Sequence, residues 1–166
     1  MSSLPEKSAG SVVLIAVDES VAVPFIIKFV AQHKWDNRTI FKIVNVIAPT
    51  MLDHPMASYP LFLESVERDV RDDAESLLKR TRAEIQAKFS DLLVQTEVIA
   101  GSPAEVIVAE AERSGAELII VGSHGRSGLK RFLLGSVSSA VIAHAPCNVM
   151  VVRVVETAKS ESEVAS

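Results

Sequence analysis

The stretch Leu118 to Gly128, LIIVGSHGRSG, places four apolar residues directly before a seven-residue loop with glycine at positions 122, 125 and 128. Three of the four apolar residues are β-branched, a composition typical of a strand buried on both faces. Because glycine has no Cβ atom, backbone N–H groups in such a loop can converge on an anion. The stretch predicts a buried strand that ends in a phosphate-binding loop.

Similar apolar runs recur along the chain and alternate with segments of helical period. The strand-like runs are Ser11 to Val17, Ile40 to Ile47 and Val149 to Val155, with a more mixed run, Leu92 to Ile99, expected at one margin of the sheet. This alternation requires crossover connections, which are right-handed. It predicts an α/β fold: an open five-stranded parallel sheet with helices on both faces.

The helical segments carry their own boundary signals. Ser102 and Glu105 form a capping-box pattern, with Pro103 at the first helical position and Gly115 placed to end the helix. Other helices are expected to begin near Pro24, near Leu63 and at Val137. The exposed face of the helix that follows Leu63 is predicted to be a solvated surface of Glu64, Glu67, Arg68, Asp69, Arg71, Asp72 and Asp73.

Composition limits the class of protein. The 166 residues are 48% hydrophobic and 23% charged, and the net charge of −4 gives no reason to expect nucleic acid as a partner. Cys147 is the only cysteine, and the N-terminal ten residues lack the apolar stretch of a secretory signal. We expect a cytoplasmic protein without a membrane partner, with a flexible start (1–10), one domain (11–155) and a disordered tail (156–166).

In an open parallel sheet, ligands bind beyond the carboxyl ends of the strands, where the winding direction reverses. Asp18 follows the first strand, and the loop from Gly122 follows the fourth. Gly135 and Ser136 then open a helix whose unpaired N–H groups offer a second anion site. The alternative reading is that the glycines only form turns and Ser136 only caps its helix.

The loop differs from the commonest phosphate-binding motifs. No Lys-Ser or Lys-Thr pair follows the glycines at the offset of a P-loop, and the G-x-G opening of the dinucleotide fingerprint is absent. The spacing Gly122-x2-Gly125-x9-Gly135-Ser136 resembles the pattern of ATP-binding members of the universal stress protein family. The resemblance extends from Val12 to Val152 and includes LIAVDES, GSPAEVI, AELIIVGSHGRSG and HAPCNVMVV.

This resemblance implies an open Rossmann-like fold, like that of the adenine nucleotide alpha hydrolases, with ATP across the carboxyl ends of the strands. Asp18 would contact adenine or ribose, and Val46 would contact the adenine. Ser138 occupies the hydroxyl position beyond Val137. The residues implied along the ribose and phosphate path are Gly122, Ser123, His124, Gly125, Gly135, Ser136 and Val137.

The same resemblance implies a homodimer through the last strand, Val149 to Val155, and a regulatory role in the stress response, with Mg²⁺ a candidate ion accompanying the nucleotide. Hydrolysis requires a positioned water and charge neutralisation. We find no clear Walker-B acid or general base, which predicts binding with little or no efficient hydrolysis. A slow ATPase and a nucleotide-free dimeric scaffold remain the alternatives.

Several residues near the predicted site have a second reading. Asp18 could instead cap the following turn, and His124 is expected to support the loop or a phosphate rather than act as a base. His144 and Cys147 are expected to serve packing rather than metal or redox chemistry.

Two further features near the site also allow two readings. The segment Ala48 to Pro60 is either a lid over the ligand or a surface insertion. The basic residues Arg126, Lys130 and Arg131 either offset phosphate charge or are solvated.

Overall fold

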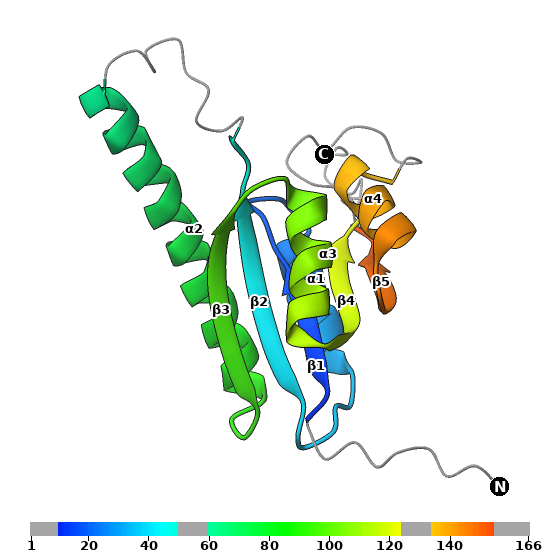
Figure 1. Ribbon diagram of the computed structural model, residues 1–166. Helices are drawn as coiled ribbons and strands as arrows, with labels where there is room; N and C mark the ends of the chain where they lie inside the picture. Colours follow the sequence, from blue (N-terminus) through cyan, green and yellow to red (C-terminus); the bar gives the residue numbers. More distant parts are fainter. Residues whose placement is uncertain (1–9, 50–59, 124–133, 155–166) are drawn as a thin grey trace, which may run out of the picture.

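The computed structural model describes residues 10–49, 60–123 and 134–154. Its five strands form one parallel sheet in the order β3-β2-β1-β4-β5, which confirms the predicted fold class (Figure 1). The strands are β1 (Val12–Ala16), β2 (Ile40–Ile47), β3 (Leu93–Ala100), β4 (Ala116–Gly122) and β5 (Asn148–Val152). The helices are α1 (Val23–Gln32), α2 (Pro60–Lys88), α3 (Pro103–Ser114) and α4 (Ser136–His144).

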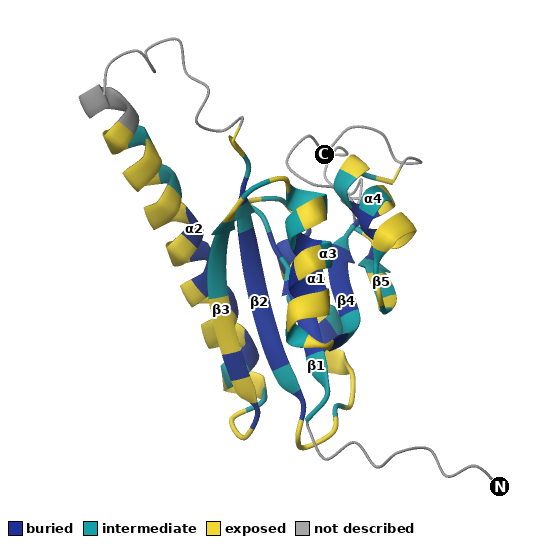
Figure 2. Cartoon of the chain, in the orientation of Figure 1, coloured by how far each residue is buried: buried dark blue, intermediate teal, exposed yellow. Residues whose placement is uncertain are grey.

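The helices cover the two faces of the sheet in pairs, and each pair packs on its own apolar cluster. Ile26 of α1 and Ile85 of α2 pack with Phe41 and Ile43 of β2 on one face. Ile107 of α3 and Val141 of α4 pack on the other. The central strands are therefore buried from both sides, as their β-branched composition predicts (Figure 2).

The strand boundaries differ slightly from those expected. β4 begins at Ala116, two residues before the apolar run at Leu118, and includes the polar Glu117. The last strand, expected over Val149 to Val155, begins at Asn148 and ends at Val152, so Arg153 and Val154 lie outside it. β3 lies at one edge of the sheet, as expected, and β5 lies at the other.

Helix ends follow the sequence signals, with one correction. Pro24 lies in the first turn of α1, and Gly115 ends α3 with the left-handed φ of 64° that favours glycine. Ser102 is the N-cap of α3, but its side chain makes no capping hydrogen bond, so the capping-box bond expected there is absent. The boundary is set instead by Pro103 and by the bond from the Val106 N–H to the Ser102 carbonyl, 2.9 Å long.

The charged face of α2 is solvated, as predicted. All seven residues named above for this helix are exposed. Much of the surface of α2 is exposed (Figure 2). The segment Ala48 to Pro60, considered above as a lid, lies mostly outside the described residues.

Candidate functional site

The sheet order places the reversal of winding between β1 and β4. From β1 the chain moves outward to β2 and β3, then returns to β4 on the opposite side of β1 and continues to β5. Because the two directions diverge from this point, the carboxyl ends of β1 and β4 flank the position where open α/β sheets bind ligands. Asp18 follows β1 there, and Gly122 is the last residue of β4.

The end of β1 is held by two hydrogen bonds from β2. The Val17 N–H donates to the Val44 carbonyl, and the side-chain amide of Asn45 donates to the Val17 carbonyl, each at 2.9 Å. Asn45 is buried, with 7% of its surface exposed. These bonds fix the backbone immediately before Asp18.

Asp18 itself is half-buried, and within the described part of the chain its carboxylate makes no hydrogen bond or ion pair. The turn that follows it is capped by Ser20, whose hydroxyl accepts a bond from the Ala22 N–H at 3.3 Å. The structure therefore gives no support, among the described residues, to the alternative in which Asp18 caps the turn. Its carboxylate is available to a ligand.

Ser123 joins the end of β4 to both β5 and α4. Its N–H donates to the Val152 carbonyl at 2.8 Å, and its carbonyl accepts from the Gly135 N–H at 2.9 Å. Its hydroxyl accepts a longer bond, 3.4 Å, from the Val154 N–H. Ser123 is thus a buried residue that bonds to both β5 and the N-cap of α4. The predicted residues His124 and Gly125 lie outside the described residues, as does the basic cluster Arg126, Lys130 and Arg131.

The first turn of α4 presents the second predicted anion site. Gly135 is the N-cap and Ser136 the first helical residue, and no side-chain bond caps the helix within the described residues. The first N–H groups of a helix have no intrahelical acceptor, and the helix dipole makes this end positive. Ser136 is exposed, so its hydroxyl can reach a ligand. The alternative in which Ser136 caps its own helix is not observed.

The remaining predicted residues lie around this turn and the end of β2. The Ser138 hydroxyl donates to the Gly135 carbonyl at 3.2 Å and is buried, so a ligand contact through it would require that bond to be exchanged. Val46 and Val137 pack at the margin of the same apolar cluster, on the α3 and α4 face. The predicted site residues that the structure describes all lie at the carboxyl ends of the strands: Asp18, Val46, Gly122, Ser123, Gly135, Ser136, Val137 and Ser138.

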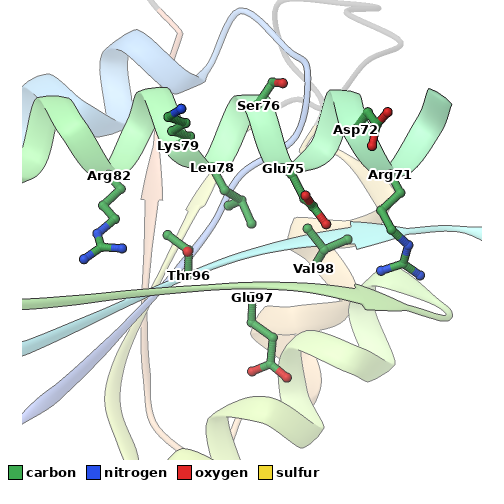
Figure 3. Close-up of a pocket in the computed structure, with 10 residues that line it drawn as sticks. All are labelled: Arg71, Asp72, Glu75, Ser76, Leu78, Lys79, Arg82, Thr96, Glu97 and Val98. Atoms are coloured by element: carbon green, nitrogen blue, oxygen red, sulfur yellow. The ribbon is translucent and has the colours of Figure 1, made fainter. Parts of the chain in front are cut away.

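A groove elsewhere on the molecule does not coincide with this edge. It lies between α2 and β3, has a volume of about 950 Å³, and includes Arg71, Glu75 and Arg82 above Thr96 and Val98 (Figure 3). None of the sequence-predicted site residues lines it. Its charged residues on α2 are of both signs: Arg71, Lys79 and Arg82 are basic, and Asp72 and Glu75 are acidic.

A partly buried ion network lies on the α3 face, and its partners could not be predicted from the local sequence. Lys42 of β2 lies 2.6 Å from Glu110 and 2.7 Å from Glu97, and Arg113 contacts the same two carboxylates at 2.7 and 3.0 Å. Burial by itself lowers the pKa of Lys42, but the two carboxylates outweigh it and raise that pKa above 10.5. Contact with Lys42 lowers the pKa of Glu97 below 4.5. The network joins β2, β3 and α3.

The lone cysteine and the histidine near it lie in different surroundings. Cys147 packs against the α3 and α4 cluster, and burial raises the pKa of its thiol, which keeps it protonated. His144 is exposed at the end of α4 and belongs to neither apolar cluster, so the expectation that it serves packing is wrong. Residues 10–49, 60–123 and 134–154 contain no group of three His, Cys, Asp or Glu side chains able to hold a metal ion. No helix in these ranges is both long and apolar enough to cross a membrane.

Comparison with known proteins gives a consistent family. The sequence profile of the universal stress protein family matches residues 11–153. A protein of Staphylococcus haemolyticus described as a universal stress protein is 32% identical over 145 residues, which cover 87% of this chain and 85% of the relative. Among solved structures, the hypothetical protein MJ0577 superposes with a TM-score of 0.78 at 26% identity, covering 89% of this chain and 98% of that one.

Two more distant structures share the fold and carry ligands. A universal stress protein family member from Arabidopsis thaliana, solved with AMP bound, has a TM-score of 0.59 at 18% identity and covers 91% of this chain and 97% of its own. The universal stress protein of Archaeoglobus fulgidus, solved in complex with dAMP, has a TM-score of 0.58 at 18% identity and covers 86% and 97%.

Proposed function

Because this chain belongs to the universal stress protein family, we propose that it binds an adenine nucleotide, ATP in particular, between the carboxyl ends of β1 and β4. One observation carries the proposal: the Asp18 carboxylate, which has no partner among the described residues, and the first turn of α4, which no described side chain caps, both lie at the carboxyl ends of the strands, beside the reversal of winding. The AMP and dAMP bound by the two distant relatives support the choice of adenine.

The two halves of the site suit the two halves of a nucleotide. The α4 turn, with its N–H groups and the Ser136 hydroxyl, has the donors and the positive dipole that bind phosphate. At the other half, a carboxylate is an acceptor for ribose hydroxyls or the adenine amino group, which fits Asp18. Val46 supplies an apolar surface beside it for the base. Mg²⁺ would be held mainly by phosphate oxygens and water, as is usual for this ion.

We propose that the bound nucleotide regulates the protein in the stress response and is hydrolysed slowly or not at all. The sequence offers no clear Walker-B acid or general base for the positioned water that hydrolysis requires. Ser123 offers a route for regulation, since it bonds to Val152 of the edge strand β5 and to Gly135 at the start of α4. A ligand that orders α4 would thereby affect the conformation of β5.

The exposed edge of β5 is the proposed contact of a homodimer. Among the described strands β5 pairs only with β4, and Met150 on it is 37% exposed. An unpaired edge of this kind associates readily with another strand, and a two-fold axis would pair it with its own copy. Light scattering at micromolar concentration should give twice the mass of the chain; a single-chain mass would contradict the dimer.

Nucleotide released from the purified protein by denaturation and identified by mass spectrometry tests the proposal. We expect adenine nucleotide from the wild type and none from Gly122→Val, which places a side chain at the end of β4. Gly115→Val is the matched control, because Gly115 lies at the opposite end of β4 and should affect stability only. Absence of nucleotide in the wild type, together with no thermal shift on adding ATP, would contradict the proposal.

The phosphate half of the site has a test of its own. Ser136→Ala should lower the affinity for ATP more than the affinity for adenosine, because adenosine has no phosphate for the Ser136 hydroxyl to bind. Equal weakening of both ligands would contradict this role. Phosphate release that is lost in Gly122→Val would show the alternative activity, slow ATP hydrolysis.

A further inference from the structure

Asn45 is a polar side chain in a strand whose neighbours, Val44 and Val46, are apolar. It is 7% exposed, and its amide donates to the carbonyl of Val17, 28 residues away in the chain, at 2.9 Å. Burying an amide is unfavourable unless its hydrogen bonds are made. An apolar side chain would be the better occupant of this position if packing were its only task.

This bond lies where the pairing of β1 comes to an end. The last β1–β2 pair is Ala16 with Val44, and the last β1–β4 pair is Ile15 with Ile120. Beyond these pairs the Val17 N–H still donates to the Val44 carbonyl, and the side-chain amide of Asn45 donates to the Val17 carbonyl. The Asn45 side chain thus extends the β1–β2 hydrogen-bond ladder by one bond. That bond holds the Val17 carbonyl, in the peptide group that links Val17 to Asp18.

We propose that Asn45 is a positioning residue for the ligand, which holds the Val17 carbonyl and so fixes the place of Asp18 at the reversal of winding. The inference rests on the proposed function, because it assigns Asn45 to the adenosine half of that site. Asn45 does not itself contact the ligand. A carboxylate that must meet ribose or adenine within hydrogen-bond distance depends on a backbone held to a fraction of an ångström.

Calorimetric titration of Asn45→Leu and Asn45→Asp with ATP and with adenosine tests this role. Both variants lose the donor, and Asn45→Leu introduces no buried charge, so it keeps the experiment decisive if Asn45→Asp does not fold. We expect the affinities for ATP and for adenosine to fall by the same factor, roughly tenfold, because the affected contact lies on the adenosine moiety that both ligands share. Thr81→Val is the matched control: Thr81 is also buried, and its hydroxyl donates to the Leu77 carbonyl at 2.9 Å in α2. This control should leave both affinities unchanged.

A double-mutant cycle with Asp18→Ala separates positioning from general destabilisation. If Asn45 acts through Asp18, then Asn45→Leu has no further effect on affinity once the carboxylate is gone. Independent, multiplying effects of the two substitutions would overturn the inference, as would wild-type affinity in Asn45→Leu. Wild-type protein that binds neither ligand would contradict the proposed function itself, a result distinguishable from both.

Discussion

Replacement of Lys42 by Met should destabilise the fold substantially, because it removes the cation from the buried Lys42–Glu110 pair. The Lys42 side chain is 11% exposed and lies 2.6 Å from Glu110, which is 4% exposed. Glu110 Oε1 makes no other polar contact with the described residues. Loss of the ammonium would therefore leave a carboxylate oxygen buried and uncompensated.

The loss of stability in Lys42→Met depends on the contacts that Glu110 and Glu97 keep. Removing one member of a buried ion pair costs ~3–5 kcal/mol. Arg113 still contacts the other oxygen of Glu110 at 2.7 Å, and the 43% exposed Glu97 regains contact with water, so we expect about 2–3 kcal/mol. At roughly 2–4 °C per kcal/mol for a chain of this size, the melting temperature should fall by about 4–12 °C.

Urea unfolding at neutral pH measures the loss, with Lys28→Met on the exposed surface of α1 as the matched control. The double variant Lys42→Met/Glu110→Leu should recover part of the stability, since it also removes the unpaired carboxylate. The reasoning is refuted if Lys42→Met is no less stable than Lys28→Met, or if the effects of the Lys42 and Glu110 substitutions simply add.

Three further predictions concern pH and the backbone. The contribution of Glu97 to stability is present above pH 4.5 and is lost as the pH falls through its lowered folded pKa, whereas the contribution of Lys42 is present below pH 10.5 and is lost as the pH rises through its raised folded pKa. Both losses should be smaller in Lys42→Met. Urea unfolding at a series of pH values checks this, and an unchanged slope of the unfolding free energy against pH in the variant would contradict it. Gly101→Ala should cost about 1–3 kcal/mol, because φ is +148° and the new Cβ would lie 2.6 Å from Val106 Cγ2; Val106→Ala in the same chain should restore only the steric part. Gly115→Ala, at φ +64° with open space around the Cβ, should cost about 1–2 kcal/mol and gain nothing from any neighbouring substitution, which chemical unfolding can check.

The order of elements could be predicted from local patterns because burial on both faces leaves a clear signature in the strands. The same reasoning placed the start of β4 too late, since Glu117 interrupts the apolar run. In the structure its carboxylate accepts a bond from the Ser11 hydroxyl at 2.7 Å, which satisfies a polar residue at the strand's start. That partner is 106 residues away and cannot be read from the local sequence.

The site was predicted unevenly for the same reason. Glycine spacing and the end of a strand are local features, so Asp18, Gly122 and Ser136 could be predicted from them as candidate site residues. Asn45 and Lys42 were counted within an apolar run, although a polar residue inside such a run is itself a signal. Their partners, Val17 and Glu110, are brought to them only by strand pairing and by the packing of α3.

The central claim is the location of the nucleotide, and amide chemical shifts in isotopically labelled protein titrated with ATP test it most directly. We predict the largest shifts at Asp18, at Gly122 and Ser123, and in the first turn of α4, with a smaller change at Asn45. Shifts confined to Arg71–Arg82 and Thr96–Val98 in the groove between α2 and β3, or no shifts at all, would contradict the account.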